Sequence, residues 1–147
     1  MTINSLAMLY PAFIMMIFTV ISLFILMFAR VIALRNDHLD QGHLKNMSFN
    51  NVKSKWILIA SRHYENLGIL TGLFYTCILI ITFLNYTNAM YLTLAWLFVG
   101  FRILHSIIHL TYNNVLQRMA TFLISNCFLI TMIMTLLIEV SSSVSIK

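Results

Sequence analysis

The strongest constraint on the fold is the uncharged, apolar start of the chain. Residues 1–29 contain no Asp, Glu, Lys or Arg, and the first charged side chain belongs to Arg30. This stretch is longer than the core of a signal peptide and long enough to cross a bilayer. The whole chain is 61% hydrophobic and 9% charged, whereas soluble domains carry about 25% charged residues. The sequence therefore predicts an integral membrane protein with a retained first span.

Three further apolar runs follow, separated by polar segments. We predict four transmembrane spans, at residues 6–30, 56–84, 90–112 and 118–140. All four belong to one domain that covers residues 1–147, and residues 36–55 form its only long polar connection. Because the later turns are short, the predicted fold class is an all-α membrane protein, an up-down bundle of four transmembrane helices.

The distribution of basic residues predicts how the spans are oriented. The connection after the first span holds Arg35, Lys45, Lys53 and Lys55, and Arg118 follows the third span, but the turn after the second span has none. Basic residues are enriched in cytoplasmic loops. We therefore expect both termini on the non-cytoplasmic side. These anchors account for the net charge of +5, and since no basic run or nucleic-acid motif occurs, nucleic acid is not an expected partner.

The third span contains polar residues at helical spacing. Arg102, His105, His109 and Tyr112, at offsets 0, 3, 7 and 10, fall on one stripe of a helix. Polar groups at membrane depth are costly and seldom face lipid, so the stripe is a site hypothesis. Arg102 lies roughly 10 Å deeper than the end of the span, too deep to reach water freely. We expect it to face the bundle or a neighbouring subunit.

The predicted topology brings polar residues of all four spans to one membrane face. In the second span, Arg62, Glu65 and Asn66 share a helix face. Arginine binds carboxylates bidentately and glutamate can hold an ammonium group, so the set suits a small zwitterionic anion. Alternatively, Arg62 and Glu65 form a surface pair and the other arginines are interfacial anchors. The residues expected to meet at this face are Arg30, Arg62, Asn66, His109, Tyr112, Asn113 and Arg118.

Two other patterns bear on function. His105 and His109 have the spacing of metal ligands, but we expect the apolar spans to offer no partner histidine and no inward pair of carboxylates. Hydrogen bonding between helices is the commoner role for such histidines, and no metal site is predicted. The aromatic residues expected to form interfacial belts are Trp56, Tyr86, Tyr91 and Trp96.

A resemblance to a known family covers essentially the whole chain. Residues 62–67, Arg-His-Tyr-Glu-Asn-Leu, and the more specific run from Leu94 to Arg118 resemble the MAPEG family, the membrane-associated proteins in eicosanoid and glutathione metabolism. The chain is most similar to bacterial-type members. The resemblance implies a homotrimer in the bacterial inner membrane, with glutathione bound between neighbouring subunits near the cytoplasmic face.

The resemblance also implies roles for individual residues. Arg118 matches the arginine proposed to stabilise the glutathione thiolate, which would attack a lipophilic electrophile or peroxide arriving from the bilayer. The chain would then be a glutathione-dependent transferase or peroxidase. His109 stands where eukaryotic members have a tyrosine. The positions that match glutathione-contacting or supporting residues are Arg30, Arg62, Asn66, Arg102 and His105.

The second helix departs from the family pattern. The family usually has a glutamate three residues after the motif asparagine and a proline two further on, where this chain has Ile69 and Thr71. Glu65 replaces an arginine and is a hypothetical substitute for the missing carboxylate. A non-catalytic membrane protein, whose polar stripe serves trimer packing or binds another small anion, therefore remains an alternative. A multidrug-type exporter is disfavoured because the first span has no embedded carboxylate.

Overall fold

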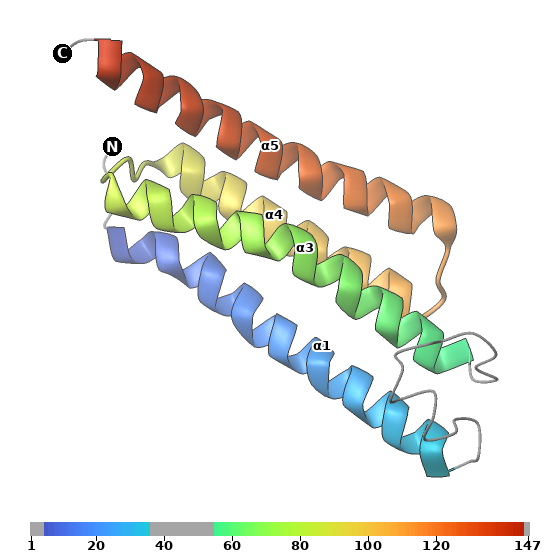
Figure 1. Cartoon of the computed structure of the whole chain (residues 1–147). Coiled ribbons are helices and arrows are strands. Elements are labelled where there is room, and N and C mark those ends of the chain that lie inside the picture. Colours follow the sequence, from blue (N-terminus) through green and yellow to red (C-terminus); the bar gives the residue numbers. More distant parts are fainter. Residues whose placement is uncertain (1–4, 36–54, 146–147) are drawn as a thin grey trace.

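The computed structural model describes residues 5–35 and 55–145, which form four long helices after one short turn of 3-10 helix (Figure 1). All four are long and apolar enough to cross a membrane. The predicted fold class, an all-α bundle of four transmembrane helices, is confirmed, and the chain is an integral multi-pass membrane protein. The elements are η1 (Ser5–Met8), α1 (Leu9–Arg35), α3 (Lys55–Phe83), α4 (Ala89–Leu110) and α5 (Val115–Ser145).

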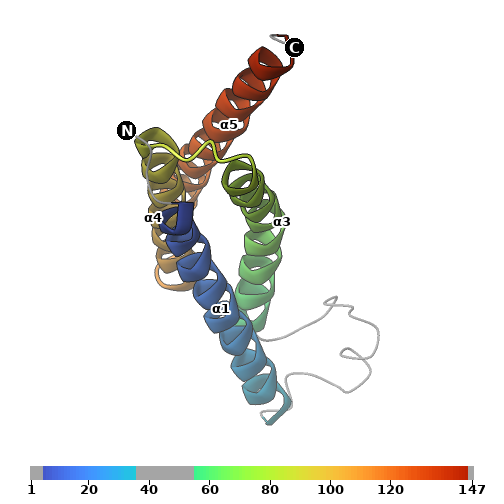
Figure 2. The same ribbon diagram turned by 90° about the vertical axis from the view of Figure 1, so that its left-hand side faces the viewer.

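The helices run up and down the bundle. α1 packs mainly against α3, α4 packs mainly against α5, and α4 also contacts α1 and α3. Figures 1 and 2 show the two labelled termini at the end that carries the α3–α4 turn, with the α4–α5 turn at the opposite end. The predicted connection at residues 36–55 lies outside the described residues apart from Lys55, the first residue of α3.

Asparagines set the two described turns. Asn85 and Asn113 have φ angles of 58° and 49°, a left-handed conformation that asparagine tolerates better than most residues. After α3, the backbone N–H of Tyr86 donates to the carbonyl of Ile81 at 3.0 Å. This hydrogen bond is typical of a helix that ends in a left-handed residue, here Asn85. The chain therefore reverses tightly at both positions.

Helix α5 begins earlier than predicted because Asn114 caps it. The side-chain oxygen of Asn114 accepts hydrogen bonds from the backbone N–H groups of Leu116 (3.1 Å) and Gln117 (3.2 Å). These N–H groups have no partner inside the helix, so the cap satisfies them. Asn88 plays the same part for α4, since its oxygen accepts from the backbone N–H of Tyr91 at 3.0 Å.

Replacing Asn114 by alanine is expected to lower the free energy of unfolding by about 1 kcal/mol, because two N–H groups lose their acceptor. Denaturant titration of the protein in detergent micelles measures the change. Asn114→Asp keeps an acceptor oxygen and should be close to wild type. An alanine variant as stable as the aspartate variant would contradict the capping role.

The interior of the bundle divides into an apolar and a polar half. The apolar half lies toward the α3–α4 turn, where the rings of Phe74 and Phe98 stack with centroids 4.5 Å apart. Most buried polar residues lie in the half toward the α4–α5 turn. They are Ser22, Ser61, His63, Arg102, His105, Ser106, His109, Thr121 and Ser125.

One of the predicted belt aromatics is a core residue. Trp56 and Trp96 are exposed on the helix surface, as an interfacial position requires. Tyr91, in contrast, is 0% exposed, and its hydroxyl donates a hydrogen bond to Oε2 of Glu139 at 3.0 Å. The prediction for Tyr91 is wrong because α5 supplies a partner for the hydroxyl inside the bundle.

Candidate functional site

The predicted polar stripe of α4 faces the interior of the bundle. Arg102, His105 and His109 are all buried, so the stripe is confirmed for these three residues. The rings of His105 and His109 lie edge to face with centroids 5.9 Å apart. Because the three residues come from successive turns of one helix, they form a continuous polar wall from mid-membrane to the α4–α5 turn.

Tyr112 does not belong to that wall. α4 ends at Leu110, and Tyr112 lies in the following turn with 64% of its side chain exposed. Its hydroxyl donates to Oε1 of Gln117 at 2.7 Å. A stripe of four residues requires α4 to continue through Tyr112, but the helix ends before the left-handed turn at Asn113. Tyr112 instead lies at the outer rim of the site.

Arg118 is held in place by the end of α4. Its Nη1 donates to the side-chain oxygen of Asn113 at 2.9 Å and lies 3.5 Å from Nε2 of His109. Its backbone carbonyl lies 2.9 Å from Nδ1 of His105. Since a guanidinium and a carbonyl have fixed roles, His109 accepts at Nε2 and His105 donates at Nδ1. Arg118 is therefore a positive charge fixed in the first turn of α5.

A third histidine, which sequence reasoning missed, joins the wall from α3. His63 is buried, and its ring centroid lies 5.6 Å from that of His109. Its Nε2 lies 3.3 Å from the hydroxyl of Ser22 in α1, which itself donates to the carbonyl of Phe18. The judgement that the spans offer no partner histidine is thus wrong. Within residues 5–35 and 55–145, however, no three His, Cys, Asp or Glu side chains are grouped to hold a metal.

Arg102 is a buried cation without a hydrogen-bonding partner. Its side chain is 0% exposed, and none of its three guanidinium nitrogens has a partner in the described part of the chain. Its guanidinium carbon lies 5.5 Å from the ring centroid of Phe98 and 5.2 Å from that of Phe122. Aromatic faces attract a cation but replace a carboxylate only in part. Arg102 therefore leaves a net positive charge inside the polar half.

An open cavity of about 290 Å³ lies beside Arg118, between α3, α4 and α5. It brings together three residues singled out from the sequence, Asn66, His105 and Arg118, from three different helices. The other lining residues are apolar and were missed, because apolar side chains in a membrane span carry no chemical signal. They are Val115, Met119 and Phe122.

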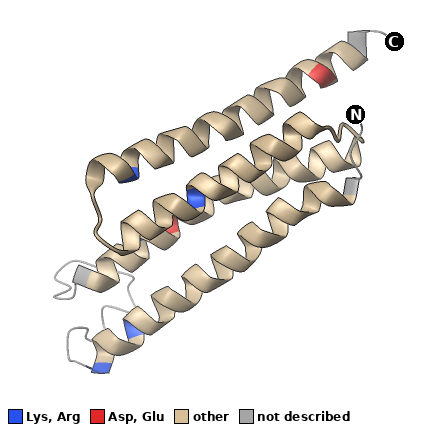
Figure 3. Cartoon of the chain, turned by 180° about the vertical axis from the view of Figure 1, so that it is seen from behind, with Lys and Arg blue, Asp and Glu red and all other residues tan. Residues whose placement is uncertain are grey.

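The remaining predicted residues do not line this cavity. Arg62 and Glu65 are exposed on α3, in the same part of the helix as Asn66. Arg30, near the end of α1, is half-buried, and its buried Nε has no hydrogen-bonding partner within residues 5–35 and 55–145. Figure 3 shows the described basic positions in the half of the bundle nearer the α4–α5 turn. This end therefore has the positive potential that an anionic ligand requires.

One comparison with known proteins gives a match. The model of the MAPEG family matches residues 8–138, nearly the whole chain. No curated protein and no solved structure matches the chain.

Proposed function

The chain belongs to the MAPEG family, and from that premise we propose that it is a glutathione-dependent transferase or peroxidase acting on lipophilic electrophiles. The observation that carries the proposal is the cavity beside Arg118, where a fixed guanidinium faces an apolar wall. Such a cavity suits a reaction between an anionic sulfur and a nonpolar partner.

Arg118 would act as the catalytic residue by stabilising negative charge on sulfur. Glutathione supplies the thiol, whose deprotonated form is the nucleophile. The guanidinium of Arg118 and the positive end of the α5 dipole both favour that form, since Arg118 lies in the first turn of α5. Val115 and Met119 are exposed on the same helix and open the cavity toward the bilayer, from which a lipophilic substrate would enter.

The exposed polar face of α3 would hold the charged ends of glutathione. Arg62 and Arg30 suit its carboxylates, and Glu65 suits its ammonium group. Ile69, which replaces the usual family glutamate, is 73% exposed one turn after Glu65, so Glu65 can present a carboxylate on the same side of the helix. Asn66 and His105 line the cavity itself, His109 and Arg102 support it from within the bundle, and Tyr112 lies at its rim.

A homotrimer would complete the site. Arg62, Glu65 and Asn66 are exposed in the single subunit, and charged groups on a membrane helix seldom face lipid. A neighbouring subunit would cover this face and enclose the ligand. The excess of basic residues at this end supports a cytoplasmic position for it, and the proposed location is a bacterial inner membrane with both termini on the other side.

A second candidate function rests on Arg102 and Ile69. Arg102 does not line the cavity, and Ile69 removes the usual carboxylate. Both features favour a non-catalytic MAPEG protein whose polar wall serves subunit packing or binds another small anion.

Titration calorimetry of the purified protein with glutathione tests the proposal. We expect saturable binding of one glutathione per subunit and conjugation of an aryl chloride added as a generic electrophile. S-methylglutathione is the matched control: it should bind but support no conjugation. Absence of binding at millimolar glutathione would eliminate the catalytic reading and favour the second candidate.

A further inference from the structure

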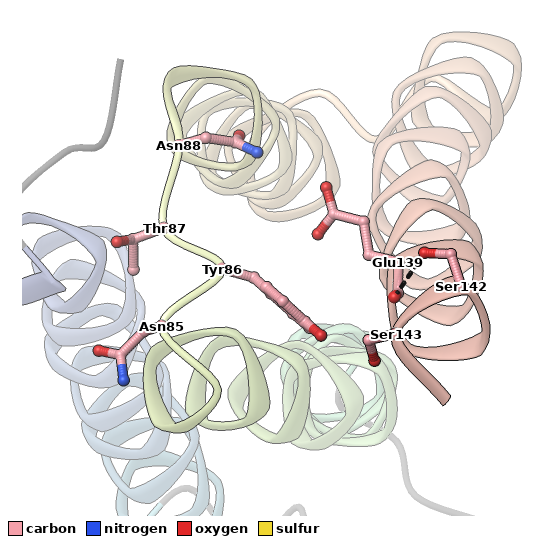
Figure 4. Close-up of a pocket in the computed structure, with 7 residues that line it drawn as sticks. All are labelled: Asn85, Tyr86, Thr87, Asn88, Glu139, Ser142 and Ser143. Atoms are coloured by element: carbon pink, nitrogen blue, oxygen red, sulfur yellow. Dashed lines mark hydrogen bonds between the residues drawn. The ribbon is translucent and has the colours of Figure 1, made fainter. Parts of the chain in front are cut away.

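The end of the bundle opposite Arg118 holds a second, larger cavity. It has a volume of about 430 Å³ and lies between the α3–α4 turn and the last turns of α5 (Figure 4). Its lining is mainly polar in type, although this end of the bundle otherwise encloses the apolar core. The polar side chains used below are Asn88 from the turn and Glu139, Ser142 and Ser143 from α5.

Glu139 gives this cavity a fixed negative charge. The buried hydroxyl of Tyr91 donates to Oε2 of Glu139 at 3.0 Å and so fixes the carboxylate while leaving its other oxygen available. In Figure 4 the carboxyl group of Glu139 points away from α5, toward the side of the turn that carries Asn88. The described basic residues lie in the other half of the bundle (Figure 3). Within residues 5–35 and 55–145, Glu139 therefore has no basic partner.

The two serines of α5 that line the cavity offer acceptors to a ligand. The hydroxyl of Ser142 donates to the carbonyl of Glu139 at 2.9 Å, and the hydroxyl of Ser143 donates to the carbonyl of Val140 at 2.7 Å. Both hydroxyl protons are thus engaged, and only oxygen lone pairs are left for a ligand. The last turns of α5 also carry the negative end of the helix dipole. The α5 side of the cavity therefore favours a ligand that is positively charged and carries N–H donors.

We propose that this cavity binds a primary ammonium group. An ammonium offers three N–H donors on a compact charge, so it can pair with the carboxylate of Glu139 and donate to other oxygens that line the cavity. Because the cavity lies at the ends of membrane-spanning helices, the ammonium can belong to an ethanolamine phospholipid or to a small free amine. This inference does not depend on glutathione binding at the other end of the bundle.

The test uses the full-length protein in phosphatidylcholine nanodiscs. In the first arm, ethylamine is titrated and compared with tetramethylammonium, which has the charge but no N–H donor. In the second arm, native mass spectrometry compares retained phosphatidylethanolamine with phosphatidylcholine of the same acyl chains. We expect wild type to prefer the ammonium form by about fivefold in at least one arm, as for a partly exposed ion pair. The arm that shows the preference identifies the source.

Glu139→Gln should abolish this preference, whereas Arg35→Gln, which removes an exposed charge at the opposite end of the bundle, should retain it. Tyr91→Phe frees the carboxylate from its only described hydroxyl donor and should reduce the preference. This variant also keeps the test decisive if Glu139→Gln does not fold. Equal binding of both head groups and both amines by wild type would overturn the proposal. A preference that persists in Glu139→Gln would overturn it as well.

Discussion

Replacing Arg118 by alanine is expected to lower the rate of glutathione conjugation by about a hundredfold or more, with the helical bundle left intact. Among the described residues that line the cavity beside it, Arg118 is the only arginine or lysine. Removing one group that stabilises a developing anion lowers the reaction rate by about a hundred- to a thousandfold. His105 forms its hydrogen bond with the backbone carbonyl of residue 118, not with the side chain. The substitution therefore leaves this hydrogen bond and the α4–α5 contact in place.

Steady-state kinetics with an aryl chloride measure this loss, and circular dichroism checks the fold. Arg118→Lys keeps a charge without the planar fork held by Asn113 and should retain an intermediate rate. Arg35→Ala, at the exposed end of α1, is the control for the loss of a positive charge on the same side of the bundle. Turnover by Arg118→Ala equal to that of Arg35→Ala would contradict the catalytic role.

Replacing Arg102 by methionine is expected to stabilise the bundle and to weaken glutathione binding. The guanidinium is fully buried, and its three nitrogens have no hydrogen-bonding partner in the part of the chain that the structure describes. Exchanging buried charges for apolar side chains of similar volume can stabilise a protein by about 1–4 kcal/mol. Loss of the buried charge also removes positive potential behind Phe122, which lines the cavity. We expect the affinity for glutathione to fall by about tenfold.

Thermal unfolding in detergent and titration calorimetry separate the two effects. Arg102→Lys keeps the charge but loses the flat guanidinium between Phe98 and Phe122. It should therefore bind glutathione nearly as well as wild type. If Arg102→Met instead loses assembly, the arginine serves packing and the non-catalytic reading gains support.

The spans and the polar wall of α4 could be predicted because both depend on periodic, local features. Arg102, His105 and His109 repeat at helical spacing, and burial is the general outcome for polar groups at membrane depth. The prediction for Tyr112 failed because its position depends on where α4 ends. The turn at Asn113 decides that end, and the spacing of polar residues does not. A helix boundary shifted by two residues is enough to move a side chain out of the interior.

The missed residues depend on contacts between helices. His63 follows an exposed arginine in the sequence, and only the packing of α3 on α1 and α4 turns its ring toward Ser22 and His109. The sequence predicts a belt position for Tyr91 because its partner, Glu139, lies on another helix. Neither contact can be predicted from the spacing of residues along one helix.

In the proposed function, the cavity beside Arg118 holds glutathione as a thiolate. Ultraviolet difference spectroscopy on mixing the protein with glutathione observes the thiolate directly, without any second substrate. We expect an absorbance band that grows saturably with glutathione in wild type and is absent in Arg118→Ala. A flat difference spectrum for wild type at saturating glutathione, or an equal band in Arg118→Ala, would contradict it.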